Sequence, residues 1–145
     1  MVNGYSRAAY AANKYAGMSP ERLVLAMFDG ALRFVEQAEA AIERKAVAEK
    51  GEAIGKAVAV VAELQTALNP QAGELTEHLE ALYDYVLRSL AKANIESDPK
   101  QLAEARGLLL VLRDGWAQML ESVQISVPAT SSSAGPGKSV AKGYL

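Results

Sequence analysis

The fold is decided first by residues 18–45, which read MSPERLVLAMFDGALRFVEQAEAAIERK. Ser19 suits a helix N-cap, Pro20 suits the first helical position, and Glu21 lies in the first turn, where an acid favours the helix dipole. Apolar residues then recur at steps of three and four, the spacing of one buried helix face. These residues are Leu23, Met27, Ala31, Phe34, Ala38 and Ile42. The stretch therefore predicts a long amphipathic helix.

Three further amphipathic runs follow. They cover about 49–68, about 74–94 and, beyond Pro99, the chain to about 121. The second run places Ile54, Ala57, Val61, Leu64 and Leu68 in phase. Asn69-Pro70 stops that run, because the residue before a proline is biased away from the helical region. Asp98, Pro99 and Gln101 suit an N-cap, a first helical residue and a capping-box partner.

Four helices of about 20 residues with short connections, and no alternating strand pattern, predict an all-α fold. We expect an antiparallel up-and-down four-helix bundle over 19–125. Residues 1–18 carry tyrosines among alanines without a continuous apolar stripe, which predicts a flexible N-terminal arm. Residues 126–145 are rich in Ser, Gly and Pro and cannot bury enough surface to offset their ordering entropy, which predicts a disordered C-terminal tail.

Composition excludes several function classes. The chain has 145 residues, a formal net charge of -2 and interleaved acids and bases, so neither nucleic acid nor an anionic membrane is an expected partner. It contains no cysteine, which excludes a disulfide framework or a thiol nucleophile. We find neither a signal-peptide core nor an apolar run near the roughly 18 residues of a membrane span. A soluble, unprocessed protein without membrane insertion is expected, and a reducing cytoplasm is compatible with it.

Catalytic motifs are sparse. His78 is the only histidine, and a phosphotransfer domain, which is a bundle with an exposed helical histidine, stays open as an alternative. Such domains usually read H-x-x-K-G, whereas His78 is followed by Leu-Glu-Ala-Leu. A di-iron bundle needs Glu-x-x-His on two helices, and one histidine cannot supply that. The sequence has no phosphate loop and no paired carboxylates in an obvious cleft. We therefore expect a protein without catalytic residues, metal or cofactor.

The stretch LYDYVLRSL, residues 82–90, carries two tyrosines on the third predicted helix. The expected core face consists of Leu75, Leu79, Leu82, Val86, Leu90 and Ala93. On a helical wheel Tyr83 and Tyr85 fall on opposite shoulders of that face, while Asp84 and Arg88 point outward as a candidate ion pair. A shoulder tyrosine buries its ring and leaves its hydroxyl free for a partner. The alternative is that both rings merely seal the seams of the bundle.

The fourth predicted helix has more apolar residues than one buried face requires. Its expected core face consists of Leu102, Ala105, Leu109, Leu112, Trp116 and Leu120. Leu108, Leu110 and Val111 are additional, with Val111 nearly opposite the core face. Because no helix of a four-helix bundle is central, such residues predict an exposed apolar patch of the kind that binds another protein. Cover by the N-terminal arm or by the tail is the alternative.

Three separated blocks resemble the FliS family of flagellar secretion chaperones, which bind flagellin. The blocks are SPERLVLAMFDGALRFVEQAEAAI (19–42), LYDYVLRSLAKANIESDPKQLAEA (82–105) and GLLLVLRDGWAQML (107–120). They agree with the family in type, order and spacing. The resemblance implies an antiparallel helical bundle in the cytoplasm. It also implies a partner, the C-terminal segment of flagellin, which would wrap around the chaperone and be kept from polymerising before delivery to the flagellar type III export apparatus.

The resemblance also gives the apolar surface a use. Helical pieces of flagellin would lie in grooves between bundle helices, a mode in which leucines supply contact area and tyrosines supply rings and hydroxyls. The predicted partner-binding residues on the bundle are Tyr83, Tyr85, Leu108, Leu110 and Val111. In the family a tyrosine-bearing arm is associated with the binding region, and Tyr10 is the matching candidate here. An export chaperone or adaptor for a different cargo stays open as an alternative.

Overall fold

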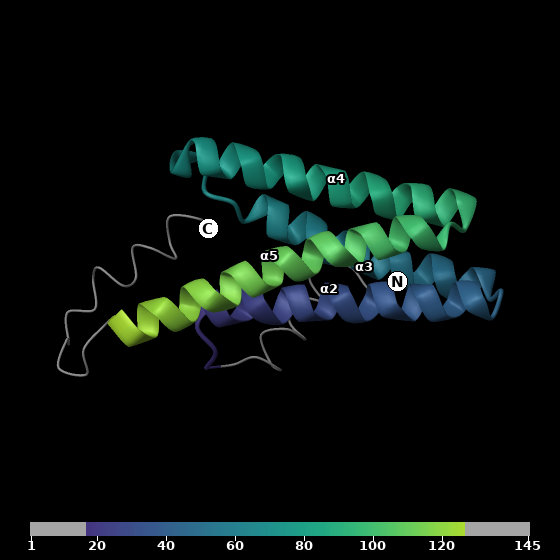
Figure 1. Ribbon diagram of the computed structural model, residues 1–145, viewed down its shortest axis with the longest axis horizontal. Coiled ribbons are helices and arrows are strands. Elements are labelled where there is room, and N and C mark those ends of the chain that lie inside the picture. The colour runs from purple at the N-terminus through teal and green to yellow at the C-terminus, as the bar shows by residue number, and fades with distance from the viewer. Residues whose placement is uncertain (1–16, 127–145) are drawn as a thin grey trace.

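The structure, a computed structural model, describes residues 17–126 of the chain (Figure 1). In chain order the elements are α2 (Pro20–Glu43), α3 (Val47–Thr66), the 3₁₀ turn η1 (Pro70–Ala72), α4 (Glu74–Glu96) and α5 (Pro99–Ser126). The predicted arm and tail fall almost wholly on residues 1–16 and 127–145, outside the described residues.

The helices begin where the sequence predicts. The Ser19 hydroxyl accepts a hydrogen bond from the Arg22 amide at 3.2 Å, which caps α2 ahead of Pro20. A carboxylate oxygen of Asp98 accepts from the Lys100 amide at 2.9 Å, next to Pro99 at the start of α5. Capping side chains thus satisfy amides that have no partner within these helices.

The connections between helices are short. Lys45 and Ser97 adopt left-handed backbone conformations that end α2 and α4. Between α3 and α4 the chain makes the turn η1, which the sequence did not predict. The Asn69 side chain accepts from the Gln71 amide at 2.9 Å, and its main-chain carbonyl accepts from the Thr76 hydroxyl at 2.6 Å. These bonds stabilise the turn, because Asn side chains readily mimic a backbone turn.

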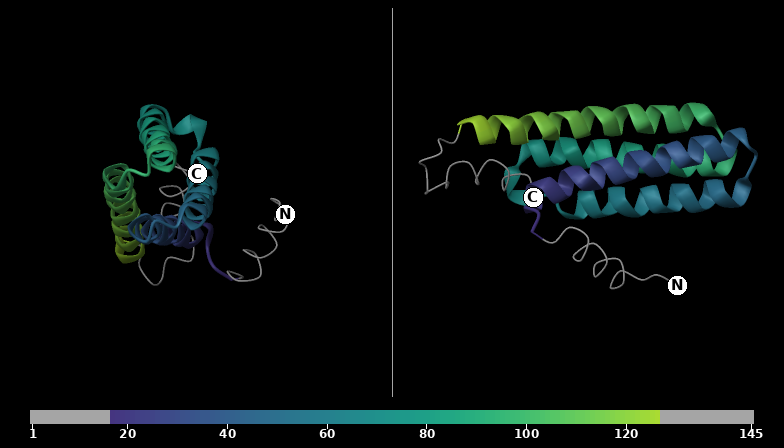
Figure 2. Two further views of the ribbon diagram at one scale, coloured as in Figure 1. Left: turned by 90° about the vertical axis from the view of Figure 1, so that its right-hand side faces the viewer. Right: turned by 90° about the horizontal axis from the view of Figure 1, so that it is seen from below.

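The four helices form a ring of antiparallel neighbours, seen end-on in Figure 2. Contacts join α2 to α3, α3 to α4, α4 to α5 and α5 back to α2. The predicted antiparallel four-helix bundle is thereby confirmed. None of the helices in residues 17–126 is long and apolar enough to cross a membrane.

On α3 and α5 the predicted core faces are largely confirmed. Buried positions include Ile54, Ala57, Val61, Leu64, Leu102, Ala105, Leu109 and Leu120. On α2 the predicted face is confirmed at Ala31 and Ala38, which are fully buried, and is displaced by one residue at three other positions. Val24, Phe28 and Val35 are buried in place of the half-buried Leu23, Met27 and Phe34. Because α2 contacts both α3 and α5, two adjacent apolar rows find partners, and spacing alone cannot tell which one is central.

Core side chains change in size along the bundle. At the closed end, where short turns join α2 to α3 and α4 to α5, many buried positions are alanine: Ala38, Ala41, Ala53, Ala57, Ala93 and Ala105. At the opposite, open end the core holds Val24, Phe28, Leu64 and Tyr83, with Leu112 and Trp116 packed against it. Helix separation depends on the side chains at the contact. Accordingly, α4 and α5 converge toward their connecting turn and diverge away from it (Figure 1).

A buried lysine secures the closed end. Lys50 of α3 is only 5% exposed. Its ammonium group donates to the Asn94 carbonyl at 2.9 Å and to the Ser97 hydroxyl at 2.6 Å. The carbonyls of the last helical turn have no partner within the helix, and a cation there also favours the helix dipole. Lys50 therefore ties α3 to the end of α4 where α4 turns into α5.

Candidate functional site: an apolar groove at the open end

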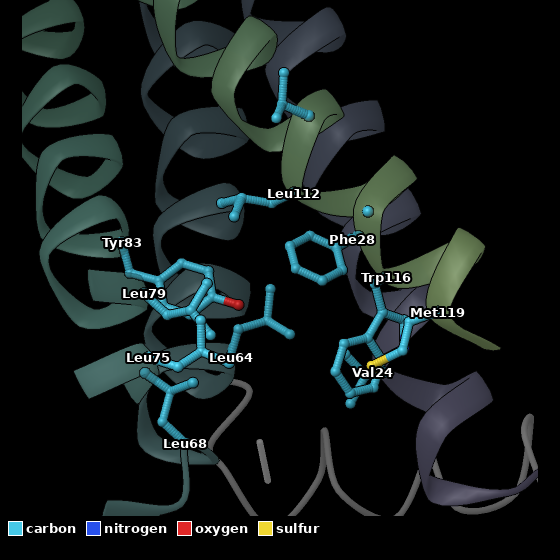
Figure 3. Close-up of a pocket in the computed structure, with 12 residues that line it drawn as sticks. Val24, Phe28, Leu64, Leu68, Leu75, Leu79, Tyr83, Leu112, Trp116 and Met119 are labelled. Atoms are coloured by element: carbon cyan, nitrogen blue, oxygen red, sulfur yellow. The ribbon is translucent and has the colours of Figure 1, made fainter. Parts of the chain in front are cut away.

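A groove of about 220 Å³ opens where α4 and α5 diverge (Figure 3). Residues of all four helices and the α3 to η1 connection line it: Val24, Phe28, Leu64, Leu68, Leu75, Leu79, Tyr83, Val111, Leu112, Gly115, Trp116 and Met119. Among the described residues, every lining side chain is apolar apart from the Tyr83 hydroxyl and the Trp116 indole N–H. This described lining thus offers apolar contact area and carries no charge.

Tyr83 forms the wall of the groove on α4. It is 5% exposed, and its ring lies 6.4 Å from the ring of Phe28, centroid to centroid. The predicted shoulder position is therefore wrong. The core face of α4 is rotated toward Tyr83, so that the expected core residue Leu82 is half-buried and Leu75 is 40% exposed at the groove. Phe28 across the core supplies the packing partner that the helical wheel of α4 alone could not reveal.

The Tyr83 hydroxyl lies at the centre of the groove, as Figure 3 shows. None of the described residues hydrogen-bonds to it, whereas every fully enclosed side-chain nitrogen or oxygen that is described has a partner. The hydroxyl therefore opens into the groove. Burial raises the pKa of Tyr83 to about 12, because the phenolate would lose its hydration. The group is a neutral hydroxyl throughout the physiological range.

Trp116 forms the wall on α5. Its indole N–H donates to the Glu21 carbonyl in the first turn of α2 at 2.8 Å, which fixes the ring against that helix. The sequence predicted Trp116 in the core, and it is half-buried and packed against the core at the groove. It is the only tryptophan in the chain.

The three additional apolar residues of α5 point in different directions. Val111 is 68% exposed and lines the groove, whereas Leu108 is half-buried beside the core and outside the groove lining. Leu110 is 44% exposed, and its helical position places it between Arg106 and Arg113, on the side of α5 that faces α2. The predicted exposure of Leu110 and Val111 is confirmed, but the two residues belong to different surfaces.

Tyr85 lies outside the groove lining, 39% exposed. The Arg88 guanidinium stands 5.9 Å from its ring centroid, within range of a cation–π contact. Asp84 accepts a hydrogen bond from the Gln65 side chain of α3 at 2.8 Å. The predicted ion pair of Asp84 with Arg88 is not among the ion pairs of the described residues. Asp84 contacts Gln65 instead, and Arg88 contacts the Tyr85 ring.

Ion pairs hold α5 to α2 rather than to α4. Arg106 lies 3.1 Å from Glu39, and Arg113 lies 2.9 Å from Asp29. The hydrogen bond with Asp29, and then that with Asp114, raises the pKa of Arg113. Among the described residues none of the ion pairs joins α4 to α5. The seam between α4 and α5 that carries the groove therefore depends on apolar contacts, while the seam between α5 and α2 has two partly exposed ion pairs in addition.

The described groove lining holds no carboxylate, histidine or cationic side chain. Residues 17–126 contain no group of three His, Cys, Asp or Glu side chains that could hold a metal. His78 is exposed on α4 and does not line the groove. Sequence reasoning missed Leu75, Met119 and Gly115 as groove residues, since nothing in the local pattern signals that α4 and α5 diverge. Tyr10 lies outside the described residues.

Comparison with known proteins identifies relatives of one kind. The profile of the family described as "Flagellar protein FliS" matches residues 1–123. The flagellar secretion chaperone FliSB of Pseudomonas aeruginosa is 38% identical over 99 residues, 68% of this chain and 79% of the relative. The flagellar secretion chaperone FliS of Bacillus subtilis is 37% identical over 114 residues, 79% of this chain and 85% of the relative. That of Salmonella typhimurium is 35% identical over 103 residues, 70% and 76% of the respective chains.

Proposed function

Because this chain belongs to the FliS family, we propose that it is an export chaperone that holds the C-terminal segment of flagellin in the cytoplasm. Bound flagellin would be prevented from polymerising and delivered to the flagellar type III export apparatus. The family is a chaperone family, and this chain is accordingly not an enzyme. A phosphotransfer role for His78 therefore has no support.

The groove at the open end is the observation that carries this function. Its volume of about 220 Å³ is below the roughly 300–1,000 Å³ typical of small-molecule pockets, and its lining is apolar. Those properties favour apolar side chains of a protein segment over a cofactor. The direction of the groove, between two diverging helices, suits a helix that lays its apolar face against α4 and α5.

Within this surface the proposed contacts have different positions. Tyr83 and Val111 line the groove itself, from α4 and α5 respectively. Tyr85 and Leu108 lie outside the lining and would extend the contact along the two helices, and Tyr10 would add to it from the N-terminal arm. Leu110 would contact cargo only if the cargo also crosses α5 to the side that faces α2.

A charge at the rim of the groove tests the function directly. Val111→Glu should leave the fold intact because Val111 is largely exposed, and should weaken binding of the flagellin C-terminal segment at least tenfold, since the carboxylate would lose water on binding. Calorimetric titration measures the affinity, and Trp116 fluorescence reports occupancy of the groove.

Ile95→Glu is the matched control, because Ile95 is 84% exposed on α4 but lies at the closed end. Its affinity should equal that of the wild type. Equal affinity of Val111→Glu and the wild type would exclude the groove as the cargo site.

Leu110→Glu then shows how far the binding surface extends. A similar loss of affinity in this variant would mean that the cargo also contacts the side of α5 that faces α2. Binding of another exported protein in place of flagellin would favour the adaptor function instead.

A further inference from the structure

The Tyr83 hydroxyl is the one groove-lining polar side-chain group for which the described residues supply no hydrogen-bond partner. The other, the Trp116 indole N–H, donates to the Glu21 carbonyl. Tyr83 is 95% buried, yet its hydroxyl oxygen points into the groove from α4 (Figure 3). Water that enters the groove can reach this oxygen. An occupant that fills the groove removes that water.

The consequence for binding is asymmetric. An occupant with a purely apolar face would leave the hydroxyl dehydrated and without a partner, a loss that offsets part of the apolar contact. An occupant with a correctly placed hydrogen-bonding group would replace the water. Sites that contain a buried polar group discriminate strongly against ligands that lack its partner. The hydroxyl therefore acts as a selectivity element in a groove that otherwise accepts any apolar surface.

We propose that Tyr83 selects cargo by donating a hydrogen bond to a side-chain amide, Asn or Gln, set within the apolar face of the bound helix. This inference rests on the proposed function, because it assigns the contact that the flagellin segment would make. It names a specificity-determining residue and the chemical group that this residue recognises.

Charge and donor capacity favour an amide. None of the described lining residues is a cation, so a carboxylate placed there would have the Tyr83 hydroxyl as its only described free donor, which is too little to replace its hydration. Backbone carbonyls inside a helical occupant are already engaged in its own hydrogen bonds. The phenol stays protonated at physiological pH, since burial raises the pKa of Tyr83 to about 12. It can therefore donate, and an amide oxygen is a neutral acceptor with two lone pairs.

The first test removes only the hydroxyl. Tyr83→Phe in the full chain should bind the flagellin C-terminal segment at least tenfold more weakly in calorimetric titration. Its melting temperature should not fall, because no described residue accepts from or donates to the hydroxyl. Thr66→Val is the control, because it removes an exposed hydroxyl of α3 that lies outside the groove lining, and its affinity for the segment should stay within about twofold of the wild type.

The second test identifies the partner by a double-mutant cycle. Each Asn and Gln of the flagellin segment is changed singly to Leu. One change should weaken binding to the wild type about tenfold and leave binding to Tyr83→Phe nearly unchanged, which is the signature of a direct pair.

The outcomes separate the two proposals. If the wild type binds and Tyr83→Phe binds equally well, the chaperone function stands and the role of the hydroxyl is refuted. If Tyr83→Phe binds weakly but no amide substitution couples to it, an amide is not the partner and the proposal is overturned. If the wild type does not bind the segment, the proposed function fails, and the selectivity element falls with it.

Discussion

The closed and open ends of the bundle use side chains of different size for opposite purposes. At the closed end the helices meet over alanines and are tied by Lys50, whose ammonium group reaches two acceptors at the end of α4. At the open end Phe28, Tyr83 and Trp116 are too large for such close contact, and α4 and α5 diverge over a groove. The close packing at the closed end leaves no room for a partner. At the open end the bulky side chains hold the helices apart, so that neighbouring helices cover the apolar surface only partly.

The difference shows how one bundle can be both rigid and receptive. Protein interiors are packed so densely that one added methylene disturbs the packing. This holds for the alanine layers of the closed end. The open end tolerates additional atoms because its lining faces space. Substitutions at the closed end should therefore lower the free energy of unfolding. An added atom at the open end should leave stability intact and weaken binding. Three variants test this difference.

The largest effect is expected for Ala93→Leu at the closed end. Ala93 is fully buried, and the added carbons would force α4 away from its neighbours, at a cost of about 3 kcal/mol in the free energy of unfolding. Chemical denaturation measures the change. Ala91→Leu, at an exposed position of the same helix, should cost close to nothing. Equal stability of the two variants would show that the closed end is not tightly packed.

An intermediate effect is expected for Lys50→Met. Methionine keeps most of the apolar stem, but leaves the Asn94 carbonyl and the Ser97 hydroxyl without their donor, which should lower the free energy of unfolding by about 2 kcal/mol. Lys92→Met at an exposed site of α4 is the control. A thermal melt unchanged by Lys50→Met would mean that water replaces the ammonium group and that the tie is dispensable.

The smallest effect, of opposite sign, is expected for Gly115→Ala at the open end. An added Cβ at Gly115 meets nothing within 4 Å, so the helix should gain about 0.5–1 kcal/mol. Gly107→Ala on the same helix also meets open space and should gain the same. Only Gly115 lines the groove, and only Gly115→Ala should weaken binding of the flagellin segment. A loss of stability at Gly115 would contradict an open groove.

Local sequence predicted the elements well because their determinants are local. Two helices begin at a capping residue followed by a proline, Ser19 with Pro20 and Asp98 with Pro99. The cap makes a short-range hydrogen bond and the proline fixes the backbone angle. The sequence predicted a buried ring for Tyr83 but not its position within the core face, because that position depends on Phe28, which lies far away in the sequence. The off-by-one core face of α2 has the same origin, a second helix that covers the flank.

The candidate site was predictable only in part. Val111 stands nearly opposite the core face of α5 in the periodic pattern, so its exposure followed from the sequence. Leu110 is equally apolar and also exposed, yet it faces the α2 side, between Arg106 and Arg113. The additional apolar residues of α5 indicate that the helix has an exposed apolar surface. They do not indicate which neighbouring helix each residue faces.

The sequence by itself determined four amphipathic helices, their starts, the exposure of Val111 and the resemblance to a chaperone family, because each follows from periodicity, capping or motif. Only the tertiary structure decided where the helices diverge, since that depends on side chains from four helices meeting at one level of the bundle. It placed the Tyr83 hydroxyl in an apolar groove and Lys50 at the end of α4. Distant residues make these contacts, and no local pattern records them.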